Sequence, residues 1–350
     1  MESHRDFDSE VGLRQSILIN TESCFVEAVD AKITNVIKSN ISFQLKEMIE
    51  YHFSVLGKRI RPRMVYGLGK SFNVSTSSLI SWAACCEILH NATLVHDDLQ
   101  DGDHLRRGVP TVWKKFGHAE AINLGDFLLL RAPLAYLTDQ LSSDIKTKLS
   151  FLYSEMASSI VDGQSREFYL NTLDSDDLEK DYFECISGKT SALFAGQAKG
   201  VGVILGLSEE TISSLSDLLH RCGNLFQIQD DLLDLYGNKG RDEVGCDLKE
   251  GKVSFLIVSH LKRHSEDFEL LKKILKKKRN ETTAEDIHNV KKLFVEKRTL
   301  LTAIEYVDSL TNEILSHSLV ETYPELKSYL SYLIGYMLKP IKHLNLSKGL

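Results

Sequence analysis

Apolar residues recur at three- and four-residue spacing along most of this 350-residue chain. That period is typical of amphipathic or buried α-helices, which turn one face toward the protein core. The segments that carry it are 31–56, 77–96, 119–140, 143–171, 178–206, 208–236 and 253–275. With only 5 prolines, the chain also lacks the frequent turn-forming residues that separate short strands. The pattern therefore predicts an all-α fold.

Turn-forming residues separate these predicted helices. Gly57 precedes one basic stretch, Gly102 and Gly108 flank another, and the glycine-rich run GNKGRDEVG covers residues 237–245. No strict repeat and no low-complexity linker divides the chain. The breaks are therefore expected to be loops within one fold.

We expect a single domain over residues 1–350, with the sequence motifs in a core at 50–260 and a helical part at 261–350. The final segment, SYLSYLIGYMLKPIKHLNLSKGL, is apolar enough to pack on the body of the protein or to cover a site. Its role stays open.

A lysine-rich run, KKILKKKRN, occupies residues 272–280. It is typical of a helix end with lysines in the last turn, followed by a capped restart at Thr282 or Thr283. Most such runs form a solvated helix face. The alternative is a basic site for a lipid diphosphate or a membrane surface.

The composition, with 43 % apolar and 26 % charged residues, is that of a globular protein with a sizeable core. A net charge of −7 argues against nucleic acid as a general partner, because a duplex binder normally presents a basic face. Any basic site must therefore be local.

Six cysteines stand at positions 24, 85, 86, 185, 222 and 246, without a C-x-x-C pair or a regular framework. This spacing indicates neither a zinc site nor a disulfide scaffold, so a reducing compartment is expected. The first thirty residues contain no apolar run of signal-peptide length, and we expect no apolar stretch of the roughly 18 residues that span a membrane. A cytoplasmic protein is the expectation.

A first acidic motif lies in LVHDDLQDGDHLRRG at 94–108, at the end of an apolar helical run. Asp97 and Asp101 are four residues apart, which puts both carboxylates on one face of a helix, about one turn apart. Such a pair can share hard divalent cations through oxygen ligands. Asp98 points to another side.

The motif recurs in FQIQDDLLDLYG at 226–237, where Asp230, Asp231 and Asp234 repeat the spacing. A single copy is equally typical of an acidic helix end that faces water. Two copies inside apolar helices favour a ligand, because buried carboxylates repel one another and lose solvation unless cations lie between them. Magnesium that bridges a diphosphate would offset that cost.

A diphosphate would also need fixed cationic side chains, which three clusters supply. They are Lys58, Arg59 and Arg61 in GKRIRP, Arg106 and Arg107 in LRRG, and Lys189 beside Thr190 in SGKTSALF. Arginine binds phosphate oxygens bidentately, whereas lysine acts as a mobile point charge. Any one cluster alone is more often structural. Their order around the acidic motifs favours a diphosphate site.

Across residues 50–260 the chain resembles the trans-isoprenyl diphosphate synthases, also called polyprenyl synthetases. Six motifs stand in that family's order: GKRIRP, EILHNATLVHDDLQDGDHLRRG, LGDFLLLRA, GKTSALF, FQIQDDLLDLYG and GCDLKEGKVSFLIV. The resemblance implies an isoprenoid synthase-type helical bundle around a deep central cavity, with the acidic motifs facing each other across its mouth. It also implies a homodimer.

The implied activity is a prenyltransferase that condenses isopentenyl diphosphate with dimethylallyl, geranyl or farnesyl diphosphate. The implied cofactor is Mg²⁺, with three ions per active site. The implied metal ligands are Asp97, Asp101, Asp230 and Asp234. The implied catalytic residues are Asp97, Asp98, Asp101, Lys189, Asp230 and Asp231, of which Asp98 and Asp231 support the ligands.

The resemblance also divides the basic residues between the two substrates. Those matched to isopentenyl diphosphate are Lys58, Arg61, His90 and Arg107. Those matched to the allylic substrate are Arg106, Lys189, Thr190, Gln227 and Lys252. His90 by itself on an apolar helix would more often be a core histidine, and only its place in EILH indicates a site residue.

The chain departs from the family pattern in three places. Arg241 stands where relatives often have a lysine after the second motif, so a positive charge is kept and Arg241 is expected to bind substrate. GQSRE places Glu167 where relatives often carry the aspartate of Gly-Gln-x-x-Asp. The terminal helix lacks the basic final residues that some relatives use, which argues against a role for the C-terminus in closing the isopentenyl site.

In the implied reaction, neutralisation of the allylic diphosphate lets its C–O bond break to an allylic cation. The double bond of isopentenyl diphosphate attacks that cation, so both substrates must be held in a near-attack arrangement. No His–Asp pair in the sequence is an obvious base, and the departing diphosphate is expected to take the proton. Apolar helix walls must keep water from the cation.

Product length is expected to depend on residues one to three turns before Asp97 on the same helix. These are Ala92 with Thr93, then Leu89, then Cys86. Relatives that stop at fifteen carbons often have an aromatic ring at the place of Ala92 or Thr93. Both residues are small here, so we expect mainly the C20 product, geranylgeranyl diphosphate, with a deeper stop from Leu89 or Phe127. The alternative is C15 farnesyl diphosphate, if a neighbouring helix blocks the path at Ala92.

Two other classes share part of this pattern. Class I terpene cyclases have a helical fold and a D-D-x-x-D motif, but they need only one diphosphate, so a second basic site would be surplus. Regulatory subunits of heteromeric synthases commonly lose aspartates from the motifs. Both sets are complete here, which favours the elongating enzyme.

Overall fold

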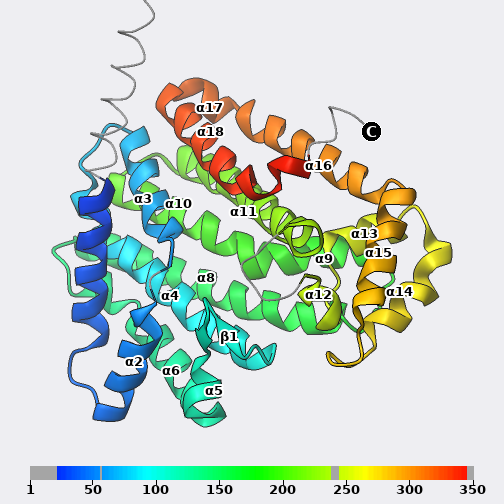
Figure 1. Ribbon diagram of the computed structural model, residues 1–350. Helices are drawn as coiled ribbons and strands as arrows, with labels where there is room; N and C mark the ends of the chain where they lie inside the picture. The colour runs from blue at the N-terminus through cyan, green and yellow to red at the C-terminus, as the bar shows by residue number, and fades with distance from the viewer. Residues whose placement is uncertain (1–21, 56, 238–243, 345–350) are drawn as a thin grey trace, which may run out of the picture. The chain divides into compact units, whose positions relative to one another are not determined.

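A computed structural model describes residues 22–55, 57–237 and 244–344, and about four fifths of them lie in helices (Figure 1). The all-α prediction is confirmed. The chain divides into two compact units. The first ends at Ser150 and takes in Val203–Gly206, and the second holds Phe151–Gly202 and the described chain from Leu207 onward. The expectation of a single domain stays a prediction.

The first unit begins with a helix over residues 22–37. Its other helices are α2 (Phe43–Ser54), α3 (Ile60–Ser71), the 3-10 helix η1 (Thr76–Leu79), α4 (Ile80–Gln100), α5 (Val112–Phe116), α6 (His118–Arg131), α7 (Leu134–Leu137) and the start of α8 (Ser143–Leu170). Strands β1 (Leu105–Arg106) and β2 (Val109–Pro110) form a short antiparallel hairpin after α4.

Local chemistry divides two segments that the hydrophobic pattern predicts as single helices. Within 31–56 the chain turns at Asn40, which has a left-handed φ of 51°, and Ser42 then caps α2. Within 119–140 the helix is interrupted at Pro133, which has no N–H to donate. Both predictions of a single continuous helix are therefore wrong, because turn and capping residues interrupt the helix despite the apolar spacing.

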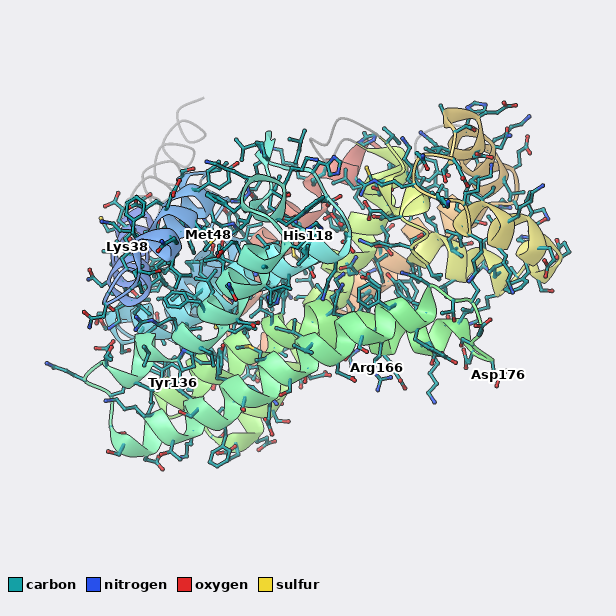
Figure 2. The ribbon with its side chains drawn as sticks, turned by 90° about the horizontal axis from the view of Figure 1, so that it is seen from below. Lys38, Met48, His118, Tyr136, Arg166 and Asp176 are labelled. Atoms are coloured by element: carbon teal, nitrogen blue, oxygen red, sulfur yellow. The ribbon has the colours of Figure 1, made fainter. Side chains whose placement is uncertain are left out.

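The second unit continues α8, which runs unbroken and carries Arg166 near its C-terminal end (Figure 2). Its other elements are α9 (Leu178–Ile186), the π-turn η2 (Ser187–Ser191), α10 (Ala192–Leu205), α11 (Glu209–Tyr236), α12 (Cys246–Lys249), α13 (Phe255–Leu261), η3 (Ser265–Asp267), α14 (Phe268–Leu275), α15 (Ala284–Glu296), α16 (Thr299–Leu315), α17 (Ser318–Thr322), α18 (Pro324–Leu338) and η4 (Lys339–Leu344).

Two sequence predictions in this unit have different outcomes. The predicted helix 253–275 is interrupted between α13 and α14, where Ser265–Asp267 forms a turn of 3-10 helix. The predicted restart after the lysine run is confirmed at Thr283, which forms a reciprocal capping box with Asp286.

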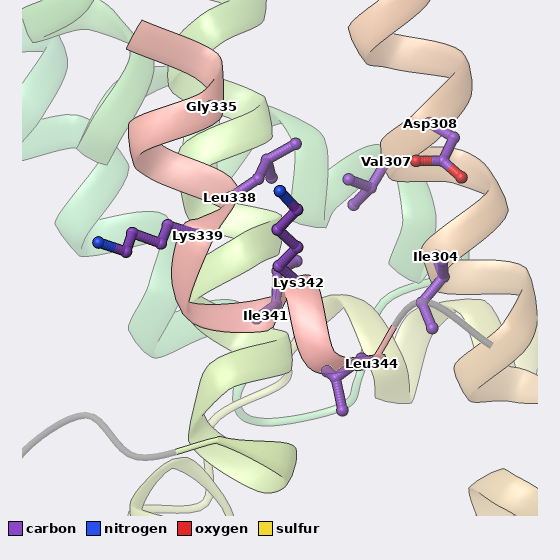
Figure 3. Close-up of a pocket in the computed structure, with 9 residues that line it drawn as sticks. All are labelled: Ile304, Val307, Asp308, Gly335, Leu338, Lys339, Ile341, Lys342 and Leu344. Carbon is purple, nitrogen blue, oxygen red and sulfur yellow. The ribbon is translucent and has the colours of Figure 1, made fainter. Parts of the chain in front are cut away.

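The C-terminal helix packs on the second unit. α18 contacts α11 and α16, and it buries Leu326, Leu330 and Ile334. An apolar pocket of about 220 Å³ lies between α16 and η4, lined by side chains such as Val307 and Ile341 (Figure 3). Packing on the body is therefore one role of the final segment.

Among the described residues, one helical stretch is long and apolar enough to cross a membrane by length and composition alone, and the expectation that the protein has no membrane span is not contradicted. Thr76–Gln100 has a mean hydropathy of 1.2 over 18 residues. However, 72 % of that window is buried inside the protein, and buried core helices pass the same test. This stretch therefore gives little support to a membrane span.

Candidate active site

The first acidic motif occupies the end of α4. Asp101 is the C-cap of the helix, and its N–H donates to the Asp97 carbonyl at 2.8 Å. Asp97 and Asp101 are half-buried, whereas Asp98 is only 2 % exposed. The two outer carboxylates thus lie one turn apart on an accessible side of α4, in agreement with their spacing.

Asp98 holds Arg106. Its Oδ1 accepts a hydrogen bond from Arg106 Nε at 2.7 Å and lies 2.6 Å from Nη2. Arg106 approaches because Arg107 and Gly108, with φ of 54° and 80°, turn the hairpin tightly. Burial raises the pKa of Asp98 to about 6, and the ion pair with Arg106 opposes that shift. Asp98 therefore orients a cation.

The charges of three arginines act on the His90 imidazole. Burial lowers the pKa of His90 well below 6.5, and the charges of Arg61, Arg106 and Arg107 lower it further. His90 is therefore neutral at pH 7, and the guanidinium groups repel one another. Such a concentration of positive charge attracts an anion with several oxygens, such as a phosphate.

The backbone positions two of these cations. Arg107 Nη1 donates to the Val55 carbonyl at 2.9 Å, and the guanidinium lies so close to Gly57 that a Cβ there would come within 2.6 Å of Nη2. The Nε of Arg61 is buried and has no hydrogen-bond partner in the described part of the chain, which is unusual unless a ligand completes the site. Lys58 is exposed.

The sequence analysis missed a polar chain behind this cluster. His52 Nε2 lies 3.0 Å from Asn91 Oδ1, Asn91 Nδ2 donates to the Glu87 carbonyl at 2.7 Å, and Glu87 Oε1 accepts from Arg59 at 3.0 Å. Burial lowers the pKa of His52 to about 4. Arg59 belongs to the GKRIRP cluster, and of the other three residues only Glu87 had a signal in the sequence, because an acid within an apolar helical run needs a cationic partner.

In the second unit, Asp231 is buried and accepts three hydrogen bonds. Its Oδ2 accepts from the Tyr182 hydroxyl and the Phe255 N–H, both at 2.7 Å, and its Oδ1 accepts from Gln227 Nε2 at 2.9 Å. Burial, followed by the charge of Asp247, raises the pKa of Asp231 to about 7, and the three donors oppose that shift. Its neighbour Asp230 is half-buried.

Lys189 and Thr190 lie in the π-turn between α9 and α10, a local widening that often occurs at functional sites. Glycines let neighbouring helices approach it. A Cβ on Gly163 of α8 would lie 2.1 Å from the Lys189 nitrogen, and one on Gly223 of α11 would lie 2.6 Å from the Ser191 Cα. These clashes explain why glycines occupy both positions.

Hydroxyl groups of the π-turn bind side chains along α11. Ser187 Oγ lies 2.7 Å from His220 Nε2, Ser191 Oγ donates to Asn224 Oδ1 at 2.7 Å, and Thr190 Oγ1 donates to Gln227 Oε1 at 2.7 Å. Their partners are three or four residues apart and therefore share a face of α11. Gln227 accepts from Thr190 and donates to Asp231, so it joins these two residues by hydrogen bonds.

Lys189 forms an ion pair with Glu167, with Nζ 2.6 Å from Oε2 and both side chains less than one-fifth exposed. Glu167 is the carboxylate that the sequence analysis noted as a departure from Gly-Gln-x-x-Asp. These two residues, noted separately in the sequence, are thus in direct contact, and Glu167 orients the lysine.

The loop after α11 is bound to the second motif. The Asp247 N–H donates to Asp234 Oδ2 at 3.1 Å, and Lys252 Nζ lies 2.9 Å from Glu250 Oε2. Asp234 is buried. Arg241, predicted as a substrate ligand, lies outside the described residues.

The residues predicted to set product length differ in burial. Ala92, Leu89 and Cys86 are 0 % exposed, whereas Thr93, four residues before Asp97, is half-buried. Ala92 shares its side of α4 with His96, which packs where Gly125 of α6 has no side chain. Thr93 therefore lies on the accessible side of α4, and Ala92 lies on the side packed against α6.

The chemistry of the carboxylates fits a divalent metal that also binds substrate oxygens. Among the described residues, no group of three or more His, Cys, Asp or Glu could hold a metal ion. Asp98 and Asp231 accept hydrogen bonds from protein donors, and Asp97, Asp101 and Asp230 are half-buried on their helices. Mg²⁺ typically takes one or two carboxylates together with water and substrate phosphates, so a closed protein cage is not required.

Sequence comparison decides the family. The chain matches the family model described as "Polyprenyl synthetase" over residues 43–294, well over half of its length. It belongs to the polyprenyl synthetase family. Membership confirms the family resemblance and makes this polyprenyl synthetase a trans-prenyltransferase.

Individual relatives agree with this assignment. The geranylgeranyl diphosphate synthase of Saccharolobus solfataricus is 34 % identical over 250 residues, which cover 69 % of this polyprenyl synthetase and 74 % of the relative. The octaprenyl diphosphate synthase of Escherichia coli is 32 % identical over 67 % of this chain and 71 % of its own. The crystal structure of geranylgeranyl pyrophosphate synthetase from Pyrococcus horikoshii has a TM-score of 0.80 at 26 % identity, covering 92 % and 99 % of the two chains. The isoprenoid synthase-type fold is thereby confirmed, whereas the facing of the two motifs across a deep cavity stays a prediction.

Proposed function

We propose that this protein condenses isopentenyl diphosphate with a short allylic diphosphate and that its main product is C20 geranylgeranyl diphosphate. The observation that carries the proposal is that the charges of Arg61, Arg106 and Arg107 act together on neutral His90. His90 lies on α4, the helix that also presents Asp97 and Asp101. Positive charge for a diphosphate and oxygen ligands for a metal thus occur in one unit.

A second phosphate site is proposed at the π-turn, where Lys189 and Thr190 are held by Glu167 and Gln227. Condensation joins two diphosphates, so two basic sites are needed to hold them in reacting order. We assign Lys58, Arg61, His90 and Arg107 to isopentenyl diphosphate. We assign Arg106, Lys189, Thr190, Gln227 and Lys252 to the allylic substrate.

We propose Mg²⁺ as the cofactor, three ions per active site, held by Asp97, Asp101, Asp230 and Asp234. A polyprenyl synthase of Caulobacter crescentus, 23 % identical, is described as a complex with calcium and isoprenyl diphosphate. When bound, the ions would make the allylic diphosphate a better leaving group. The protein's own part is to orient Arg106 through Asp98 and to keep Thr190 and Gln227 in place through Asp231.

The reaction is tested with purified protein, MgCl₂ and labelled isopentenyl diphosphate, offered dimethylallyl, geranyl or farnesyl diphosphate in turn. Mass spectrometry of the products should show linear chains longer by five-carbon units. A cyclic hydrocarbon formed without isopentenyl diphosphate would identify a cyclase instead, and inactivity with every primer would favour a regulatory subunit.

Two features support the C20 assignment: the small side chains at Ala92 and Thr93, and relatives named geranylgeranyl diphosphate synthase. Because Thr93 is on the accessible side of α4, Thr93→Phe should shorten the product to fifteen carbons. Ala92→Phe is the matched comparison, because it adds the same ring on the side packed against α6. Unchanged product length in an active Thr93→Phe enzyme would show that the tail does not pass this residue.

We also propose that the protein is a cytoplasmic homodimer. Support comes from α8, which exposes Phe151, Val161 and Phe168 by 72 %, 61 % and 47 %. Large apolar side chains on a helix surface are typical of contact with another chain. Sedimentation equilibrium should give twice the 39.5 kDa chain mass, and Phe151→Glu should weaken the dimer. The six cysteines are free and five are buried, which fits a reducing compartment.

A further inference from the structure

A strongly basic segment joins α14 to α15 in this otherwise acidic protein. Residues 272–279 include six Lys or Arg and no acid, although the whole chain has a net charge of −7. The proposed reaction uses none of these side chains. The charge on this segment is therefore available for another partner.

Internal contacts account for three of the six cations. Lys277 pairs with Asp286 at 2.7 Å, Arg279 Nη2 lies 3.3 Å from Glu250, and Lys272 lies over a neighbouring aromatic ring. The other three lysines are exposed and have no carboxylate within 4.0 Å in the described part of the chain. We call these residues, Lys273, Lys276 and Lys278, the lysine surface.

Acidic side chains nearby reduce this charge only in part. Glu269 and Glu281 are exposed at the two ends of the segment, and Glu281 accepts a hydrogen bond from the Lys278 N–H at 3.3 Å. Over residues 268–281 there are six basic and two acidic side chains, so the segment keeps a net charge of +4.

Apolar surface adjoins the lysine surface. Leu270 of α14 is 50 % exposed, three residues before Lys273. Beside it, a pocket of about 170 Å³ between α14 and α15 is lined by apolar Leu270, Ile274, Val290 and Leu293 and by polar Lys273, Lys277, Asp286 and Asn289. The surface therefore combines positive charge with a partly apolar hollow.

We propose that the lysine surface and Leu270 dock this protein on an anionic phospholipid bilayer. A bilayer offers both phosphate-bearing headgroups for the lysines and acyl chains for Leu270 and the pocket, whereas an acidic protein segment would match the charge alone. Docking goes beyond the proposed reaction and does not depend on it. Docking would also let a lipid product pass from the enzyme directly into the acyl chains of the bilayer.

The proposal is tested by flotation of the full-length protein with vesicles of phosphatidylcholine alone or with about 30 % phosphatidylserine. The wild type should float only with the anionic vesicles, and raising NaCl from about 0.05 M to about 0.5 M should release it. Each lysine near an anionic surface raises partitioning roughly fivefold, so K273A/K276A/K278A should lower the partition coefficient roughly a hundredfold. Leu270→Ser should lower it less and leave the salt dependence intact.

The matched control is K46A/K70A/K327A, which removes the same charge from three exposed lysines on α2, α3 and α18. It should bind vesicles like the wild type. Equal losses in both triple variants, or no binding of wild type to anionic vesicles, would overturn the proposal. So would release by inorganic phosphate at matched ionic strength, which indicates a free-phosphate site, or tight binding to polyglutamate without vesicle binding, which indicates an acidic protein.

Turnover of soluble short substrates, measured without vesicles, should be unchanged in K273A/K276A/K278A. Failure of the proposed reaction would appear as inactivity of the wild type in that assay. Failure of the docking proposal would appear only in flotation, so the two results are distinguishable.

Discussion

The two acidic motifs have the same D-D-x-x-D sequence, but they differ in what holds the middle aspartate. Asp98 in α4 binds a charged partner, Arg106, from a hairpin that follows the motif. Asp231 in α11 binds neutral donors, Tyr182, Gln227 and the Phe255 N–H. The first motif is therefore coupled to a charged side chain on the β1–β2 hairpin, whereas the second is coupled to neutral groups of α9, α11 and α13.

The setting of the outer aspartates differs as well. Asp101 ends α4 and is half-buried, whereas Asp234 lies inside α11, is buried and accepts the Asp247 N–H. One motif thus ends its helix just before the basic β1–β2 hairpin, and the other is enclosed. The two motifs share a short sequence but differ in hydrogen-bond partners and burial, because different residues pack against them.

The largest expected effect tests what the motifs share. Asp97→Ala and Asp230→Ala should each lower turnover by at least about a hundredfold, the scale for loss of electrostatic stabilisation in the reacting state. Both side chains are half-buried, so melting temperatures should stay close to that of the wild type. Steady-state kinetics at saturating Mg²⁺ measures the effect, and near-normal turnover in either variant would disprove the assignment for that motif.

The next test concerns the cations of the first motif. Arg106→Ala should raise the Michaelis constant for the allylic primer, and Arg107→Ala that for isopentenyl diphosphate, each by about tenfold or more, because a charge-assisted hydrogen bond is lost. Asp98→Asn should resemble Arg106→Ala if its role is to orient Arg106. Equal changes for both substrates in both arginine variants would contradict the division into two sites.

A stability test probes how tightly α8 packs against the π-turn in the second unit. Gly163→Ala would place a Cβ 2.1 Å from the Lys189 backbone nitrogen, and such overpacking should cost about 1–3 kcal/mol of unfolding free energy. Gly335→Ala in α18 is the control, because no atom lies within 4 Å of the added Cβ, and it should stabilise by up to about 1 kcal/mol. Urea denaturation distinguishes them. A tolerated Gly163→Ala would mean that the π-turn is not tightly enclosed.

The smallest expected effect is a pH dependence in the first unit. Burial lowers the pKa of His52 to about 4, so the unfolded chain binds a proton at higher pH than the folded protein does. Its contribution to stability is therefore present above about pH 6.5 and is lost as pH falls toward about 4. Urea titrations across this range should show a shallower pH slope in His52→Gln. An identical slope would assign the acid sensitivity to other groups.

The sequence by itself determined the helical fold class and the helix face on which the outer aspartates of each motif lie. Helical spacing of apolar residues predicts α4, α8 and α11 closely, because each buries a continuous face over many turns. The spacing of Asp97 from Asp101 and of Asp230 from Asp234 places each pair on one helix face, since that follows from the α-helical period alone. The start of α15 at its cap Thr283 likewise depends only on neighbouring residues in the sequence.

Only the tertiary structure decided which partners these residues have. The bonds from Tyr182 and Phe255 to Asp231, from Arg59 to Glu87, and from His52 to Asn91 join residues 24 to 49 positions apart, and periodicity carries no information about such contacts. The π-turn at Lys189 and Thr190 likewise depends on helices that approach over Gly163 and Gly223. Local spacing fixes the face on which a side chain lies, whereas its hydrogen bonds and its pKa depend on what the rest of the fold packs against that face.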